Sequence, residues 1–298
     1  MFVLYEYALS PRSIWQRFRA NKVAIFGLGV ILTVAAMAIF APILATHDPY
    51  LITPAHKFLP PSPEHWFGTD NLGRDSYSRI MFGSRISLLV GLVASMIASV
   101  IGIIVGALTG YYRGWLDEII MRITDVFLVI PQFFLFVMVL TAIRTRSSLV
   151  IALMLGVLIW PRMARLVRSE FLSLRELNYT KAAKAIGASD FRIIFRHLLP
   201  NALPVIPVTM MFYVSISILS QATLAFLGLG DPSELSWGIL LKVGQEEMRY
   251  HWWMATFPGL LLFITVLGFM CIGDGLRDIL DPRLRGAKGR RKEWMKSS

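Results

Sequence analysis

Six stretches of about 20 mostly apolar residues recur along the chain, separated by segments rich in charge and proline. A helix needs about this length to cross the hydrocarbon of a bilayer. The pattern therefore predicts an all-α, polytopic membrane protein with six transmembrane helices, at residues 23–45, 86–111, 119–143, 149–167, 204–227 and 253–272. The first stretch is long and ends without a small-residue cleavage site, so we expect a transmembrane helix there and not a signal peptide.

Composition supports this interpretation. Of 298 residues, 55% are apolar and only 16% are charged, whereas soluble domains carry about 25% charged residues. These values exclude an ordinary soluble enzyme. The net charge of +11 on so apolar a chain favours loops that face anionic lipid and partner proteins, with no nucleic acid bound. The single Cys271 excludes an intrachain disulfide framework and a thiolate metal cluster.

Positive charge predicts the sidedness. With the N-terminus inside, the inner segments hold 22 Lys and Arg residues and the outer segments 8. This bias places both termini in the cytoplasm and predicts a multi-pass protein of a bacterial or archaeal cytoplasmic (inner) membrane. The expected parts are a cytoplasmic N-terminal segment 1–22, the first helix 23–45, an extracytoplasmic segment 46–85, a five-helix core 86–282 and a basic, lipid-facing cytoplasmic tail 283–298.

Two outer segments have distinct patterns. Segment 46–85 begins with prolines and ends in 70–84, where four apolar residues oppose three charged ones; this predicts a helix lying in the outer interface, with a solvated loop as the alternative. Its histidines, His47, His56 and His65, recur every nine residues without carboxylates at ligand spacing, so we expect no metal site. Four aromatic residues lie in or directly after the second outer segment, 228–252, and we expect their side chains at the level of the lipid headgroups: Trp237, Tyr250, Trp252 and Trp253.

The longest inner loop, 168–201, predicts two short helices. The first, 179–186, is rich in alanine, and Gly187 is a natural helix stop. Ser189 is a plausible N-cap for the second helix, which places Phe191, Ile194, Phe195 and Leu198 on one side and which Pro200 closes. Such a hairpin fits either a docking element or a self-packed loop.

The spacing within this loop favours docking. The loop contains Lys181-Ala182-Ala183, then Gly187, then Leu199-Pro200. This pattern resembles the EAA loop of ATP-binding-cassette importer permeases, which is the coupling helix that sits in a groove of the ATPase subunit. The match has two departures, Lys181 in place of Glu and His197 in place of Ile. The resemblance implies an ATPase-docking surface that comprises Lys181, Ala182, Ala183, Gly187, Phe191, Ile194, Leu199 and Pro200.

Two further motifs narrow the resemblance. Two runs resemble signatures of the dipeptide, oligopeptide and nickel branch. The first is Phe67-Gly68-Thr69-Asp70-Asn71-Leu72-Gly73-Arg74-Asp75. The second is Gly273-Asp274-Gly275-Leu276-Arg277-Asp278 followed by Asp281-Pro282-Arg283-Leu284. Both are similar to that branch's C-type permease subunit. The resemblance implies a homologous second permease, two cytoplasmic ATPase subunits and an external substrate-binding protein, with peptides as substrate and nickel or another solute as the alternative.

The chain carries no nucleotide-binding or catalytic motif. It lacks GxxxxGK[ST], HExxH, CxxC and GxSxG, so no catalytic residue and no cofactor is expected in it, and ATP and Mg²⁺ would belong to the partner ATPases. A stand-alone secondary transporter, which would favour internal repeats, and an intramembrane enzyme are the rival interpretations. The two halves show no convincing repeat and the hairpin would have no role in the first, and Asp125 has no obvious catalytic partner for the second.

Several residues within the spans suggest packing or transport roles. Gly102, Gly106 and Gly110 belong to a small-residue face that packs either within the chain or across a permease dimer. Asp125 is expected to form a structural pair with Arg122, with a substrate or proton site as the alternative. Pro131 predicts a kinked helix. Polar residues at Gln132, Ser217 and Gln221 are the candidates for lining a translocation path.

Overall fold

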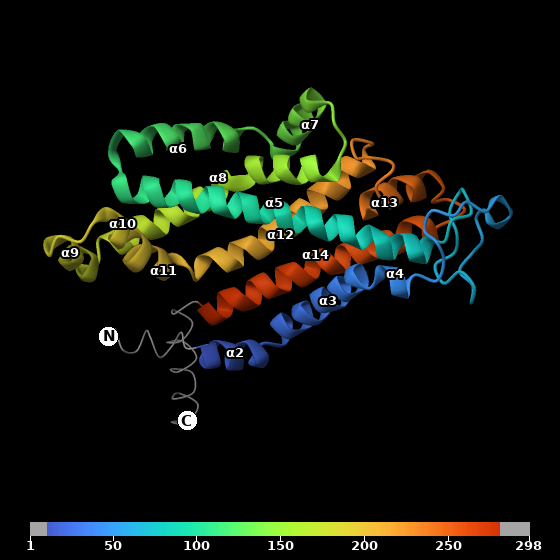
Figure 1. Ribbon diagram of the computed structural model, residues 1–298, viewed down its shortest axis with the longest axis horizontal. Coiled ribbons are helices and arrows are strands. Elements are labelled where there is room, and N and C mark those ends of the chain that lie inside the picture. Colours follow the sequence, from blue (N-terminus) through green and yellow to red (C-terminus); the bar gives the residue numbers. More distant parts are fainter. Residues whose placement is uncertain (1–10, 281–298) are drawn as a thin grey trace, which may run out of the picture.

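The computed structural model describes residues 11–280, which fold as a bundle of helices (Figure 1). Within this range the one β-type pairing is an isolated bridge between Thr69 and Asp75, so the all-α expectation is confirmed. The basic tail 283–298 and the second part of the last signature motif, residues 281–284, lie outside the described residues. The elements are α2 (Pro11–Ala20), α3 (Lys22–Ile39), α4 (Ala41–Leu44), η1 (Pro54–His56), α5 (Ser76–Tyr112), α6 (Gly114–Val129), α7 (Gln132–Ile143), α8 (Ser148–Arg175), α9 (Asn178–Ala185), α10 (Asp190–Arg192), η2 (Ile193–Leu198), α11 (Leu199–Ala202), α12 (Val205–Phe226), α13 (Trp237–Glu246) and α14 (Trp253–Leu280).

Five single helices are long and apolar enough to cross a membrane: α3, α5, α8, α12 and α14. The third predicted span is not one kinked helix but two, α6 and α7, which meet at 93°. Ile130 is extended at φ −74° and ψ 127°, because proline disfavours helical backbone in the residue before it. Pro131 then stands at the N-cap of α7. The expected kink is therefore a complete break in the helix.

The predicted interfacial helix at residues 70–84 is wrong. The Asp75 carboxylate accepts a hydrogen bond from the Ser78 N–H at 2.8 Å and so caps the start of α5, which then runs unbroken to Tyr112. Arg79, expected on a solvated face, is buried. Its guanidinium donates to the Pro49 carbonyl at 2.9 Å, because a buried charge needs such partners.

Glycines let α5 and α8 pack closely. A Cβ on Gly102 would lie 2.5 Å from the Met163 Cβ, and one on Gly106 would lie 2.5 Å from the Ala164 carbonyl oxygen. Gly110 approaches Phe171 in the same way. Of the two alternatives for this small-residue face, the structure thus shows packing within the chain, in the manner of close helix pairs in lipid.

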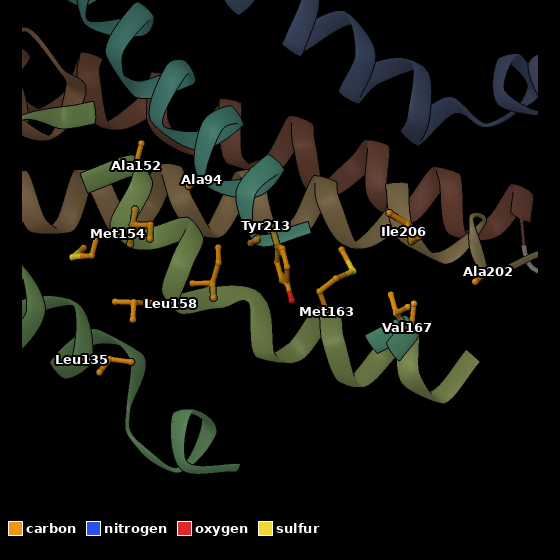
Figure 2. Packing of buried hydrophobic residues seen from close by; sticks show 14 of the residues in the cluster. Ala94, Leu135, Ala152, Met154, Leu158, Met163, Val167, Ala202, Ile206 and Tyr213 are labelled. Atoms are coloured by element: carbon orange, nitrogen blue, oxygen red, sulfur yellow. The ribbon is translucent and has the colours of Figure 1, made fainter. Parts of the chain in front are cut away.

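The main core lies between α5, α8 and α12 and extends to the hairpin that follows α8. Tyr213 of α12 extends toward α8 between Leu158 and Met163 (Figure 2). A second core joins α3, α5, α12, α13 and α14. A Cβ on Gly275, within the last signature motif, would lie 2.4 Å from the Ala24 Cβ, so this glycine lets α3 and α14 approach closely beside a third, smaller cluster that includes Ala24.

The connecting segments divide between the two ends of the bundle (Figure 1). Helix α2, helices α9 to α11 and the last turn of α14 lie at one end, which we call the hairpin end. The loop 45–75 and α13 lie at the other, the loop end. Within residues 11–280, the segments predicted to share one side of the membrane therefore share one end of the bundle. Which side each end faces stays a prediction.

Two expectations about the loop end need correction. Trp237, placed by sequence at the headgroup level, is fully buried and donates its indole N–H to the Ile80 carbonyl at 3.2 Å. Trp253 is also buried, whereas Tyr250 and Trp252 are exposed. The outer histidines, expected to be solvated or interfacial, are brought together by the folding of loop 45–75, and His65 is buried.

Candidate coupling surface

The first half of the predicted hairpin is confirmed nearly to the residue. Helix α9 ends at Ala185, and Gly187 follows with φ +80°, a left-handed conformation that glycine adopts without strain. The Ala188 N–H bonds back to the Ala183 carbonyl at 3.1 Å, which satisfies a free carbonyl at the helix end. The Ser189 side chain then accepts from the Arg192 N–H at 3.4 Å, as expected of an N-cap.

The second half differs from expectation because Pro200 does not end the helix. Residues 193–198 form one wide π-helical turn, in which the Leu199 N–H bonds to the Ile194 carbonyl five residues back. Pro200 then falls in the first turn of α11, where its missing N–H is not needed. The helical path therefore continues past Pro200 to Ala202 and brings the hairpin up to α12. Throughout, "the hairpin" denotes residues 178–202.

The predicted apolar face is divided between the interior and the surface. Ile194 and Leu198 are buried, together with Ile193, and extend the core of the bundle into the hairpin. Phe191 and Phe195 point outward, 71% and 53% exposed, with their rings 4.4 Å apart. Ile194 is therefore a structural residue in this conformation, not a docking anchor.

Sequence analysis missed the most exposed apolar side chain of the hairpin, Ile186, which is 85% exposed. The signal for it was its position directly before Gly187, at the tip of the turn. Of the other candidates, Ala182, Gly187 and Pro200 are exposed, Leu199 is half-buried and Ala183 is buried. The surface formed by Ile186, Phe191 and Phe195 is called the apolar tip below.

Positive charge surrounds the apolar tip. Lys184, Arg192 and Arg196 are all exposed. Lys181, which stands where the resembled motif has Glu, donates to Glu176 at 3.2 Å. This hydrogen bond and the charge of Lys181 lower the pKa of the Glu176 carboxyl, so Lys181 already has a partner within the chain.

Polar contacts connect the hairpin and the transmembrane helices next to it. The Tyr111 hydroxyl at the end of α5 donates to Asp190 at 2.5 Å, and Arg175 of α8 donates to the Tyr111 carbonyl at 2.7 Å. About two turns earlier in α8, Arg168 binds both carboxylate oxygens of Asp117, at 2.6 and 2.7 Å. The Asp190 contact thus ties the hairpin to α5, and the arginine contacts tie α8 to α5 and α6.

The candidates for a translocation path are not gathered in one place. Ser217 and Gln221 lie one turn apart on α12, and both are 1% exposed. Ser217 Oγ and Gln221 Oε1 make no hydrogen bond within the described part of the chain. Gln132 is half-buried on another helix, at the start of α7. Ser217 and Gln221 are thus shielded from solvent in this conformation.

The partner predicted for Asp125 is also wrong. Its carboxylate pairs with Arg165 of α8, and not with Arg122 of its own helix. Both side chains are about half exposed. The pair links the last part of α6 to α8, consistent with a structural role.

Two known protein families match this chain. The family described as binding-protein-dependent transport system inner membrane component matches residues 82–286, and the N-terminal transmembrane domain of oligopeptide transport permease C matches residues 12–61. The chain belongs to this permease family. Because its relatives are inner-membrane permeases, it is a multi-pass inner-membrane protein.

Individual relatives agree along nearly the whole chain. The oligopeptide transport system permease protein OppC of Bacillus subtilis is 40% identical, over 92% of this chain and 91% of its own. The dipeptide permease DppC of the same organism is also 40% identical, over 91% and 85%. The glutathione permease GsiD of Pectobacterium atrosepticum is 39% identical, over 92% and 91%.

A solved structure shares the fold. An inward-facing conformation of the MetNI methionine ABC transporter superposes with a TM-score of 0.55 at 22% identity, covering 67% of this chain and 96% of that one. At this identity the likeness shows the fold alone. About two thirds of the chain thus has the fold of a solved ABC transporter chain.

Proposed function

We propose that this chain is a permease subunit of an ATP-driven importer for peptides. It would form half of the translocation path, with a homologous second permease as the other half. The substrate class rests on the relatives, which are permeases named for oligopeptides, dipeptides and glutathione. In this arrangement two cytoplasmic ATPase subunits hold the ATP and Mg²⁺, and an external binding protein delivers the substrate.

The hairpin carries the proposal of ATPase coupling. Its inner face is fixed in the core by Ile193, Ile194 and Leu198, while the apolar tip finds no cover within the described chain. Exposed aromatic and aliphatic side chains of this kind are typical anchors in protein interfaces. The surrounding Lys184, Arg192 and Arg196 favour an acidic rim on the partner.

A push or pull on the apolar tip would reach the bundle through the contacts of Asp190 and Arg175 with Tyr111. The hairpin end would then face the cytoplasm and the loop end the exterior, as the distribution of positive charge predicts.

Co-purification in mild detergent tests the coupling. Ile186→Ala combined with Phe191→Ala is expected to lose most of the ATPase subunits while keeping the second permease, and Gly187→Arg is expected to do the same. Trp115→Ala is the matched control, because Trp115 is 74% exposed at the start of α6 but lies outside the hairpin. Equal ATPase recovery from all variants would overturn the proposal.

Uptake assays test the substrate class. Cells that lack this chain are expected to lose uptake of labelled di- and oligopeptides and to regain it with the wild-type gene. Uptake of a nickel salt in the same cells serves as the alternative. Loss of nickel uptake with unchanged peptide uptake would contradict the proposed substrate.

A further inference from the structure

Three histidines meet at the loop end, although each comes from a different part of loop 45–75. His47 follows α4, His56 ends η1, and His65 precedes the first signature motif. The rings of His47 and His65 lie 4.7 Å apart, and those of His56 and His65 lie 5.6 Å apart. His65 is the centre of the group and is only 4% exposed.

Two of the ring nitrogens are spaced as ligands of one metal ion, and two further ligand atoms lie near them. His65 Nε2 and His56 Nδ1 are 3.4 Å apart, close to the separation of roughly 3.3 Å between two nitrogens bound to a tetrahedral Zn²⁺ at its usual bond length. A ring nitrogen of His47, one of His65 and a carboxylate oxygen of Glu64 all lie within 4.8 Å of one another. Glu64 is exposed, and His47 is half-exposed with its Nδ1 3.0 Å from Thr46 Oγ1 and 3.8 Å from Asp75 Oδ1, so a rotation of these two side chains would complete the ligand set.

A buried carboxylate holds the central histidine in place. His65 Nδ1 lies 2.9 Å from Asp75 Oδ1, and both side chains are buried. When Nδ1–H donates to Asp75, Nε2 is left without a proton and can bind a metal. Carboxylate–histidine pairs of this kind orient metal ligands and make them more basic.

We propose that His47, His56, His65 and Glu64 bind one divalent transition-metal ion, with Asp75 as the supporting carboxylate. Three imidazoles and one carboxylate suit Zn²⁺, or Ni²⁺ and Cu²⁺, in preference to Mg²⁺ or Ca²⁺, which take oxygen ligands. The bound ion ties the two halves of loop 45–75 to each other. Through Asp75, which caps α5, it also ties them to the start of that helix.

The test uses the full chain with its co-purifying partners, carrying an affinity tag without histidine and stripped with a chelator. Titration with Zn²⁺ against a chromophoric chelator is expected to show one tight site per chain, and Zn²⁺ is expected to raise the melting temperature. Co²⁺ is expected to give the intense visible bands of a tetrahedral site.

Substitutions locate the site. His47→Gln and His56→Gln, which change the less buried ligands, are each expected to weaken Zn²⁺ binding at least tenfold while leaving the melting temperature of the metal-free protein unchanged. His65→Gln should abolish binding. His251→Gln is the matched control, because His251 lies at the same end but stacks on Phe58 at 4.2 Å, outside the cluster. No saturable site, or wild-type affinity in the His47 and His56 variants, would overturn the proposal and leave a hydrogen-bonded histidine cluster.

Discussion

The Tyr111 hydroxyl and the Asp190 carboxylate are 2.5 Å apart, which joins the last turn of α5 to the first turn of α10. The residues are 79 positions apart in sequence. Asp190 lies one residue after the N-cap of its helix, and Tyr111 is largely buried. This contact fixes the position of the hairpin relative to α5, so that the hairpin is not held by its chain connection to α8 alone.

Removing the hydroxyl should loosen the hairpin without unfolding it. A hydrogen bond to a charged group contributes about 1.5–3 kcal/mol, so Tyr111→Phe is expected to speed hydrogen exchange of amides in residues 178–202 at least tenfold. Tyr112→Phe is the control, because Tyr112 is 51% exposed and its hydroxyl makes no hydrogen bond in the described structure. Identical exchange in the two variants would show that the contact does not hold the hairpin.

Close packing of α5 on α8 predicts a strong contrast between two glycines. Gly106→Ala should destabilise the protein by about 1–3 kcal/mol, because the new Cβ would overlap the Ala164 carbonyl and force the helices apart. Gly29→Ala in α3 should cause no loss, since a Cβ there meets nothing within 4 Å. Thermal denaturation in detergent measures both. A stable Gly106→Ala variant would mean that α5 and α8 separate easily.

Two ion pairs that link α6 to α8 should differ in strength. The Asp117–Arg168 pair is bidentate and partly buried, whereas Asp125 and Arg165 are about half exposed. Double-mutant cycles on unfolding are expected to give a coupling energy of about 1–2 kcal/mol for the first pair and under about 0.5 kcal/mol for the second. A larger coupling energy for Asp125–Arg165 than for Asp117–Arg168 would contradict this prediction.

Gln221 allows a test of the translocation path. Its buried, unpaired Oε1 should cost about 1–3 kcal/mol of stability, so Gln221→Leu is expected to raise the melting temperature. If another conformation exposes Gln221 to substrate, as we predict, the same variant should lower peptide uptake at least fivefold. Thr223→Val on the same helix is the control, because Thr223 bonds to its own backbone. Undiminished uptake would remove Gln221 from the path.

The helices were predictable where local chemistry alone decides them. Gly187 and Ser189 mark the turn of the hairpin because a left-handed glycine and an N-cap serine act within three or four residues of themselves. The 93° break at Ile130 was only half predicted. A proline signals a weakened helix, but whether the chain bends or breaks depends on its neighbours.

Contacts between distant segments were not predictable from one sequence. Helical periodicity placed Phe191 and Ile194 on one face, yet Ile194 packs into the core and Phe191 faces outward, because the π-helical turn and the approach of α8 decide which side is covered. The nine-residue spacing of the outer histidines carried no sign of their meeting. Only the irregular path of loop 45–75 brings them together.

Helix α5 runs for 37 residues without interruption, about 55 Å at the rise of an α-helix, whereas the hydrocarbon layer is about 30 Å thick. It therefore protrudes from the bilayer and behaves as a rigid rod. One tip carries Asp75, which is bonded to His65, and the other carries Tyr111, which is bonded to Asp190. A stiff helix that is fixed at both ends cannot move at one end without moving at the other. A displacement at one face of the membrane is therefore transmitted to the other face through a single helix.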